Sequence, residues 1–311
     1  MRAHAVSFGI IVGMLGTGLV TQACSSSNGG SSGLVADAGG ADAPVDAATA
    51  PEVRVSFAAR VGSKPFDCGA TYDNLGTPPR SASPLTFALY VHDVRLLAKD
   101  GAEVPLTLTQ DDTWQYKNLA LLDFENRTGT CSNGTTETND VVVGTLPAGS
   151  GSSFTGVAFK VGVPADINHE NVATQPSPLN LSSMFWDWQG GYKFMRIDFL
   201  AGAGGDAGVP SATLLHLGST ACSGQGNAVT CAKLNTPEVK LVGNFVPGST
   251  RVVIDYAKLV QGIDLANDQG GAKGCMAGAS DPDCASIFQA LGLDIATGGA
   301  SSTPQTAFRL E

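Results

Sequence analysis

Histidine is scarce in this chain, with four copies in 311 residues, so each copy is a candidate for chemistry. His92 lies in the strand-like run ALYVHDVRL, His169 follows another such run in GVPADINHEN, and His216 lies in LLHLGS. Imidazole suits copper, zinc, iron or nickel, and three histidines at strands or strand ends predict a metal site if the fold brings them together. Each histidine taken alone is better explained by an ordinary hydrogen-bonded role, because histidine is intermediate in its preference for burial.

The stretch SMFWDWQGGYKFMRIDF, residues 183–199, holds two of the three tryptophans. Trp186 and Trp188 are spaced to project on the same side of an extended backbone. Met184 and Met195 add thioether sulfur, which is a soft ligand for copper(I). Core packing explains the same residue types, since tryptophan buries a large area and methionine fills gaps.

Motifs for other chemistry are absent from the sequence. It has no G-x-S-x-G elbow and no P-loop, and NHENVA lacks the second histidine of H-E-x-x-H. We therefore expect that the protein is not an enzyme. The alternative, a hydrolase of unrecognised type, would need a titratable pair such as Asp198 and His216. The net charge of −10 without a basic stripe argues against a nucleic-acid partner.

The elements that must position these residues have the pattern of short strands. Runs with β-branched and aromatic residues at period two are bounded by Gly, Pro, Asn and Asp. They occur at 53–61, 85–98, 104–108, 116–124, 140–146, 156–163, 192–200, 213–219, 238–245 and 251–260. KDG at 99–101 predicts a hairpin turn, and 283–293 predicts one short C-terminal helix. Strands without alternating long helices predict an all-β, antiparallel, Greek-key-like β-sandwich with disulfides.

The first fifty residues have the composition of an export signal and a tether. Residues 1–23 combine an early arginine with an apolar run that is short for a membrane span, which is typical of a secretory signal. Cys24 follows this run directly and is the predicted lipidation site. Residues 24–51 are rich in Ser, Gly, Ala and Asp and predict a flexible tether, so 52–311 is the expected single domain, with 262–311 as a C-terminal extension.

Six further cysteines remain, and an even number in an exported chain favours disulfides over zinc. Cys222 with Cys231, and Cys275 with Cys284, each enclose a short loop rich in turn residues. Cys68 and Cys131 are then left as a pair, although six cysteines allow 15 pairings.

An ordered set of segments resembles one family. These are PFDCGATYDNLG, FALYVHDVRLL, WQYKNLALLDFEN, CSNGTTETN, GVPADINHEN, SPLNLSSMFWDWQGGYKFMRID and HLGSTACSGQG, in order from about residue 53 to 260. The chain resembles the MbnP-like exported copper proteins, in the branch called metallo-mystery pair four-Cys motif proteins. The resemblance implies that the four family cysteines are Cys68, Cys131, Cys222 and Cys231, with Cys275 and Cys284 as an additional disulfide.

The same resemblance implies copper, as copper(I), held by histidines: His216 and His169 first, then His92. It implies a partner, a di-haem cytochrome c peroxidase-like protein of the MauG type, which oxidises a tryptophan to kynurenine. The candidates for this oxidation are Trp186 and Trp188, with Trp114 as a third.

The expected function is therefore copper storage, scavenging or delivery outside the cytoplasm. The expected location is the periplasm or cell surface, through a lipid anchor in the outer membrane. The alternative is a metal-free, tethered β-sandwich that binds a glycan or a protein. That alternative predicts that both Trp186 and Trp188 are exposed as a stacking platform.

Overall fold

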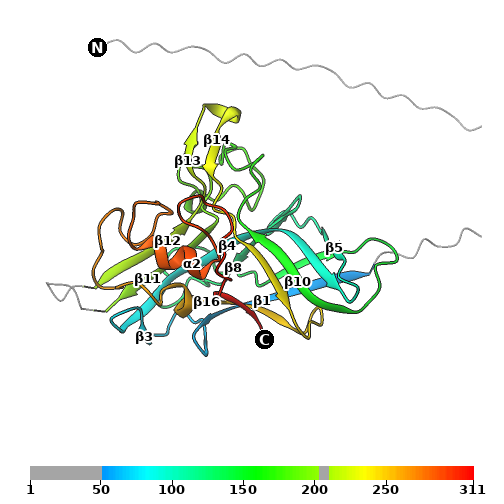
Figure 1. The fold of residues 1–311 in the computed structure, drawn as a ribbon, viewed down its shortest axis with the longest axis horizontal. Coiled ribbons are helices and arrows are strands. Elements are labelled where there is room, and N and C mark those ends of the chain that lie inside the picture. Colours follow the sequence, from blue (N-terminus) through cyan, green and yellow to red (C-terminus); the bar gives the residue numbers. More distant parts are fainter. Residues whose placement is uncertain (1–50, 203–209) are drawn as a thin grey trace, which may run out of the picture. The chain divides into compact units, whose positions relative to one another are not determined.

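Two β-sheets make up most of the chain in the computed structural model, which describes residues 51–202 and 210–311 (Figure 1). The strands are β1 (Glu52–Val61), β2 (Lys64–Pro65), β3 (Tyr72–Leu75), β4 (Arg80–Ala98), β5 (Glu103–Pro105), β6 (Thr107–Leu108), β7 (Gln115–Tyr116), β8 (Leu119–Asp123), β9 (Val141–Thr145), β10 (Phe154–Val161), β11 (Met195–Ala201), β12 (Ser211–Leu217), β13 (Thr220–Ser223), β14 (Thr230–Lys233), β15 (Glu238–Val242), β16 (Arg251–Asp255) and β17 (Phe308–Leu310). The helices are α1 (Tyr256–Leu259) and α2 (Cys284–Ala290), with short 3-10 turns at Ser182–Met184 and Gly226–Ala228.

One sheet has the order β17-β16-β1-β9-β6, with β2 paired to β1. The other has the order β12-β11-β4-β10-β15, with β3, β5 and β8 also paired to β4 and β7 paired to β8. The strand pairings are antiparallel except for β1 with β16, which run parallel. The β13–β14 hairpin stands apart from both sheets and projects from the rest of the domain (Figure 1). The predicted all-β sandwich is thus confirmed, and each of the ten predicted runs contains a strand.

The end of one predicted strand is wrong. Residues 251–260 begin as β16, but the chain turns into α1 at Tyr256. Asp255 explains the change, because its Oδ1 accepts a hydrogen bond from the Ala257 amide at 3.1 Å and caps the helix. The predicted C-terminal helix is confirmed as α2.

Aromatic side chains join the two sheets in the core. Phe57 of β1 and Phe308 of β17 both pack edge-to-face on Phe159 of β10, with ring centroids 5.5 and 5.6 Å apart. Phe199 of β11 stacks on Tyr256 at 3.7 Å. Rings of this size bury large apolar areas, so they account for much of the attraction between the sheets. Phe308 also shows that the end of the chain belongs to the sandwich itself.

The 19-residue strand β4 changes its neighbour along one edge at Tyr90. Residues before this point pair with β11, and residues after it pair with β10. The Tyr90 amide donates to the Phe194 carbonyl at 2.9 Å, and the Tyr90 carbonyl accepts from the Gly162 amide at 2.9 Å. The strands β10 and β11 therefore end at one place, and residues 162–194 leave the sheet there.

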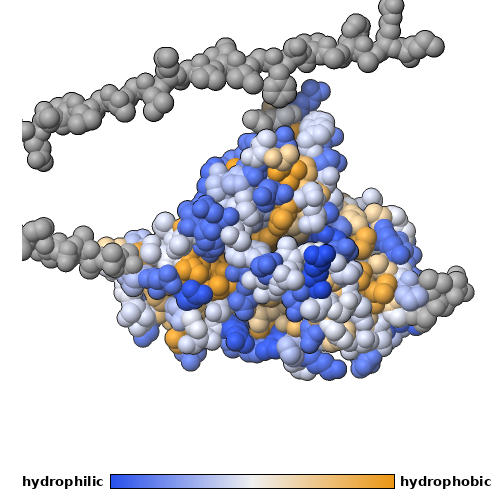
Figure 2. Space-filling view, turned by 180° about the vertical axis from the view of Figure 1, so that it is seen from behind, coloured by the Kyte–Doolittle hydropathy of each residue, from blue (hydrophilic) through white to orange (hydrophobic). Residues whose placement is uncertain are grey.

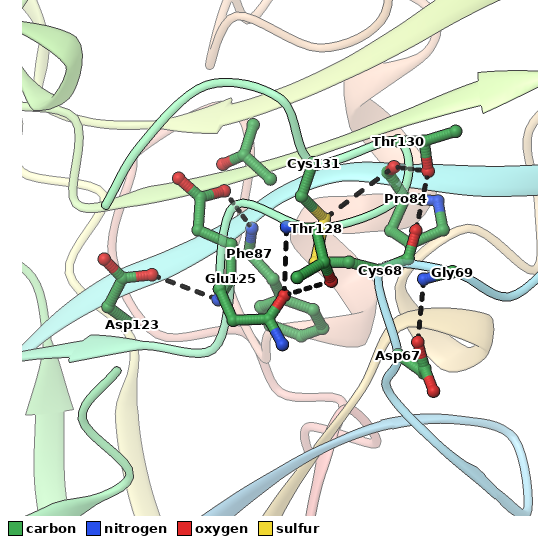
Figure 3. The surroundings of a disulfide bond; sticks show 12 residues. Asp67, Cys68, Gly69, Pro84, Phe87, Asp123, Glu125, Thr128, Thr130 and Cys131 are labelled. Atoms are coloured by element: carbon green, nitrogen blue, oxygen red, sulfur yellow. Dashed lines mark hydrogen bonds between the residues drawn. A yellow bond between two sulfur atoms is a disulfide. The ribbon is translucent and has the colours of Figure 1, made fainter. Parts of the chain in front are cut away.

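All six cysteines after residue 50 form disulfides: Cys68–Cys131, Cys222–Cys231 and Cys275–Cys284. The pairs expected from loop spacing are confirmed, and so is the remaining pair. Three disulfides indicate an oxidising compartment outside the cytoplasm. The Cys68–Cys131 disulfide lies beside the loop that follows β8 (Figure 3).

Residues 1–50, with the predicted signal, the lipidation site Cys24 and nearly all of the tether, lie outside the described residues. Among the residues that are described, no helix has the length and apolar character needed to cross a membrane. On the face shown in Figure 2, apolar residues form separate patches among polar ones.

Two carboxyl groups lie next to each other near the Cys68–Cys131 disulfide (Figure 3). Asp123 Oδ1 accepts a hydrogen bond from the Glu125 amide, and Glu125 Oε2 accepts from the Phe87 amide at 3.2 Å. Burial, together with the neighbouring Glu125 charge, raises the pKa of Asp123 to about 7. Burial also raises the pKa of Glu125.

This environment makes stability depend on pH. The folded state holds the Asp123 proton more tightly than the unfolded chain, whose pKa is near 3.8. The contribution is therefore complete below the unfolded pKa and is lost as pH rises through about 7. We expect Asp123→Asn to remove this loss and to raise the free energy of unfolding at alkaline pH by roughly 1–3 kcal/mol.

Urea unfolding of both proteins on each side of neutral pH measures the difference. The exposed carboxylate Asp140, changed to asparagine, is the matched control and should leave the pH dependence unchanged. An Asp123→Asn variant with the same pH dependence as the parent would contradict this assignment.

Candidate metal centre

The segment between β10 and β11, residues 162–194, carries His169, Trp186 and Trp188. Two tyrosines hold it in place, Tyr90 of β4 from the sheet and Tyr192 from within the segment. The Tyr90 hydroxyl donates to the Pro178 carbonyl at 2.8 Å, and the Tyr192 hydroxyl donates to the Leu179 carbonyl at 2.6 Å. The two rings also pack edge-to-face, 6.0 Å apart. Buried hydroxyls bonded in this way hold the segment in one position over the sheet.

His216 lies on β12, opposite Arg196 of β11. Its Nε2 donates to Asp198 Oδ1 at 2.9 Å, and Asp198 Oδ2 accepts from Arg196 Nε at 3.0 Å. Its Nδ1 is buried and has no hydrogen-bond partner among the described residues. Because the carboxylate fixes the proton on Nε2, Nδ1 keeps a free lone pair inside the protein.

Trp186 packs against the end of the same strand. A Cβ at Gly218 would lie 2.4 Å from Cζ3 of Trp186, so only glycine allows the indole to approach the backbone this closely. The indole is half-buried and borders a cavity of about 330 Å³ that Met276 also lines. Trp188, by contrast, is 50% exposed. The two tryptophans therefore lie in different environments.

His169 is held by three neighbours. Its Nδ1 donates to the Trp188 carbonyl at 3.2 Å, and its Nε2 accepts from Asn168 Nδ2 at 3.1 Å. The Asn168 amide is oriented in turn, because its Oδ1 accepts from the Tyr192 amide at 3.0 Å. The same Nε2 lies 3.2 Å from Sγ of Cys231.

His92 is buried in β4, two residues after the strand changes its neighbour. Its Nδ1 donates to the Gly162 carbonyl at 2.8 Å, which leaves Nε2 as the acceptor. His92 also borders a cavity of about 290 Å³ that Lys160, Glu238 and Ser219 line. Ser219, two residues after the end of β12, borders the cavity beside Trp186 as well, so the two cavities lie on either side of the same short stretch of chain.

The three histidines share one arrangement: one ring nitrogen donates to a fixed oxygen, and the other keeps its lone pair. Metal-binding histidines are held in this way, since the outer hydrogen bond sets the tautomer and the ring orientation. Burial lowers the pKa of His92 and of His169, which favours the neutral ring that binds metal.

The structure does not bring the three histidines into one group. Within the described residues, one set of three side chains places potential ligand atoms within 4.8 Å of each other: His169, Cys222 and Cys231. The two cysteines are joined as a disulfide, and the thiolate rather than the disulfide is the metal ligand. His92 lies on β4, His216 on β12 and His169 in the segment after β10, so a different element places each histidine.

The pair Asp198 and His216 named above for a hydrolase does exist. A nucleophile would have to bond to Nδ1 of His216, and no hydroxyl or thiol does so in the part of the chain that the structure describes. The arrangement lacks the nucleophile–base contact on which covalent catalysis depends.

Sequence reasoning missed Asn168, Arg196 and Gly218 as residues that position this site. The strand register contains a signal for Arg196, since period two puts it on the face of Asp198 and opposite His216. No sequence pattern predicts that Asn168 bonds to both His169 and Tyr192, because the second bond joins residues 24 positions apart.

These features define a class: a disulfide-bonded, all-β protein in which each of three histidines has one ring nitrogen bonded to a fixed oxygen. The MbnP family model matches residues 50–277, and the chain belongs to this family. The fold is similar to that of MbnP from Methylosinus trichosporium, with a TM-score of 0.75 and 36% sequence identity. That match covers 84% of this chain and 98% of the other. No curated protein sequence matches the chain significantly.

The close approach of Trp186 to Gly218 leads to a prediction. We expect Gly218→Ala to displace the indole, to shift tryptophan fluorescence toward that of a more exposed ring, and to lower the free energy of unfolding by about 1–3 kcal/mol. Thermal unfolding followed by fluorescence measures both effects.

Gly299→Ala is the matched control, because an added Cβ there meets Thr297 at an ordinary 3.6 Å. Equal stability and equal emission in the two variants would show that Trp186 does not lie against Gly218.

Proposed function

We propose that this protein binds copper outside the cytoplasm and stores, scavenges or delivers it without acting as a catalyst. The observation that carries the proposal is the buried, unpartnered Nδ1 of His216, whose other nitrogen is fixed by Asp198. Leaving a buried polar atom without a partner costs free energy, and a metal ligand bond would compensate this cost. Membership in the MbnP family supports the same metal.

The residues present fit copper(I). Imidazole and thioether are ligands that copper(I) accepts, and a low coordination number suits a site with few donors. His216 is the first ligand, and His92 and His169 are further candidates with free or weakly occupied lone pairs. Bound copper would supply a one-electron redox centre; the protein would supply its neutral imidazoles and a shielded environment.

We further propose that Trp186 is oxidised to kynurenine by a di-haem partner of the MauG type. Its indole lies against Gly218, two residues from His216 and on the same face of the chain in an extended strand. Kynurenine has an aniline nitrogen and a ketone, so oxidation would create a new donor near the histidine. Trp188 is more exposed, and Trp114 lies in a different segment, so they are the second and third candidates.

The proposed location is the periplasm or cell surface, with Cys24 as a lipid anchor in the outer membrane. The disulfides support export.

The alternative is the metal-free binding module, for a glycan or a protein. A stacking platform would need both tryptophans to be open to solvent, and the half-buried Trp186 does not fit this requirement. The exposed Trp188 fits it alone.

Elemental analysis of the mature protein from its native host tests the proposal. We expect near-stoichiometric copper, and at least a tenfold lower copper affinity, on the order expected for a lost ligand, in His216→Gln. His4 belongs to the predicted signal, so His92 and His169 are the other two histidines of the mature chain. The copper affinities of His92→Gln and His169→Gln then show which of these two residues is also a ligand. No copper after growth with ample copper would contradict the proposal and favour the binding module.

Peptide mass measurement on the same protein tests the oxidation. Conversion of tryptophan to kynurenine removes one carbon and adds one oxygen. Trp186 and Trp188 share one tryptic peptide, since no Lys or Arg lies between Lys160 and Lys193, so fragment ions must locate the change, and we expect it on Trp186. The unmodified mass in a host without the di-haem partner is the control. Fragment ions that place the change on Trp188 or Trp114 instead would contradict the assignment to Trp186.

A further inference from the structure

The Cys222–Cys231 disulfide differs from the other two in its exposure. Its two cysteines are half-buried, whereas the cysteines of the other two disulfides are at most 2% exposed. It also lies in the β13–β14 hairpin, which projects from the two sheets (Figure 1). Accessible disulfides are the ones that thiols reduce first, because the attacking thiolate must reach a sulfur atom.

The hairpin would keep both cysteines together after reduction. Cys222 and Cys231 are directly opposed in the register, with the pairs Thr220–Lys233 and Ser223–Thr230 on either side. A chelating pair held by neighbouring strands loses little conformational entropy when it binds an ion. The two sulfur atoms would thus remain on the same side of the hairpin.

A third ligand is already in place. Nε2 of His169 lies 3.2 Å from Sγ of Cys231, and the Trp188 carbonyl fixes the proton on Nδ1, so Nε2 is the nitrogen with the lone pair. That lone pair accepts from Asn168 Nδ2 at 3.1 Å, and an ion bound there would replace this one hydrogen bond. Ligand atoms bound tetrahedrally to one ion at about 2.0–2.3 Å lie roughly 3.3–3.8 Å apart. The imidazole needs little movement to reach this spacing, and breaking the S–S bond lets the two sulfurs separate.

Access from solvent is also present. Cys222 borders the cavity of about 330 Å³, together with Asp187 and Gln189. This opening leaves space for an attacking thiol and for a water molecule as a fourth ligand. The other two disulfides are packed among core residues and lack such an opening in the described structure.

We propose that reduction converts Cys222, Cys231 and His169 into a site for one thiophilic ion, zinc(II) or copper(I). A dithiol donor attacks the disulfide and is itself oxidised to a disulfide, which delivers two electrons and two protons and leaves two thiols. Binding of the ion releases one proton from each thiol, because the thiolate is the ligand. The site is closed in the oxidised protein and open in the reduced protein, and it does not depend on the copper site at His216.

The first step is tested with limiting dithiothreitol on the mature protein. Alkylation with iodoacetamide and peptide mass measurement then identify the free thiols. We expect label on Cys222 and Cys231 while the other four cysteines remain oxidised. Label that appears first on another pair would overturn the proposal.

The second step uses zinc alone, so that copper binding at His216 does not enter the result. Under anaerobic dialysis we expect one more equivalent of zinc in the reduced protein than in the oxidised protein. His169→Gln should lower the zinc affinity of the reduced form on the order of tenfold or more, while Gln225→Asn, at an exposed position in the turn of the same hairpin, is the control and should not change it. Equal zinc in both redox states, or an unchanged affinity in His169→Gln, would overturn the proposal.

The double variant Cys222→Ser with Cys231→Ser separates this site from the proposed function. It should lose the additional zinc and keep the copper measured by elemental analysis. Loss of copper together with the zinc in the double variant would show that the two sites share ligands and would overturn their independence. Absence of copper from the parent would contradict the copper proposal alone.

Discussion

The candidate site depends on two backbone hydrogen bonds made by Tyr90. Its amide bonds to the end of β11 and its carbonyl bonds to the end of β10, so β4 exchanges one neighbour for the other within a single residue. A strand that changed neighbours without these bonds would leave buried backbone groups unpaired, which is costly. Both departing strands must therefore end here, and the segment between them must leave the sheet. His92 lies two residues later, and its imidazole bonds to Gly162, the residue whose amide bonds to Tyr90.

The segment that leaves the sheet is long, and side-chain hydrogen bonds hold it in addition to one short backbone bridge near its end. The hydroxyls of Tyr90 and Tyr192 bind carbonyls within it, and Asn168 joins its beginning to its end. Such bonds are directional, so they fix orientation as well as proximity. Trp186 itself is held by an antiparallel bridge between Phe185 and Tyr192, where its amide donates to the Gly191 carbonyl at 3.0 Å, and its indole lies against Gly218. A buried polar network of this kind supports a site because each partner restricts the next.

The strands were predictable because alternation of apolar and polar residues follows directly from burial of one face. The error at 256–260 arose because an apolar run does not distinguish strand from helix, and the capping role of Asp255 depends on the turn that follows. The disulfides were predictable for short loops, where sequence separation limits the partners, and Cys68–Cys131 followed by elimination. The histidines were recognisable as candidates by type. Their separation was not predictable, because it depends on how strands and a loop far apart in the sequence pack together, and no local pattern of residues indicates that packing.

The environments of His216 and His169 indicate why one domain would keep two kinds of ligand. His216 is buried and its proton is fixed by a carboxylate, so its free nitrogen is available whatever the redox state of the surroundings. His169 is half-buried and lies against the Cys222–Cys231 disulfide. The two thiolates that would bind an ion together with His169 form only when this disulfide is reduced by two electrons. Neutral nitrogen ligands and thiolates also differ in affinity, since thiolates bind copper(I) and zinc(II) more strongly as soft donors. A constitutive nitrogen site and a conditional sulfur site would therefore respond to different signals, the concentration of metal in one case and the supply of reducing thiols in the other.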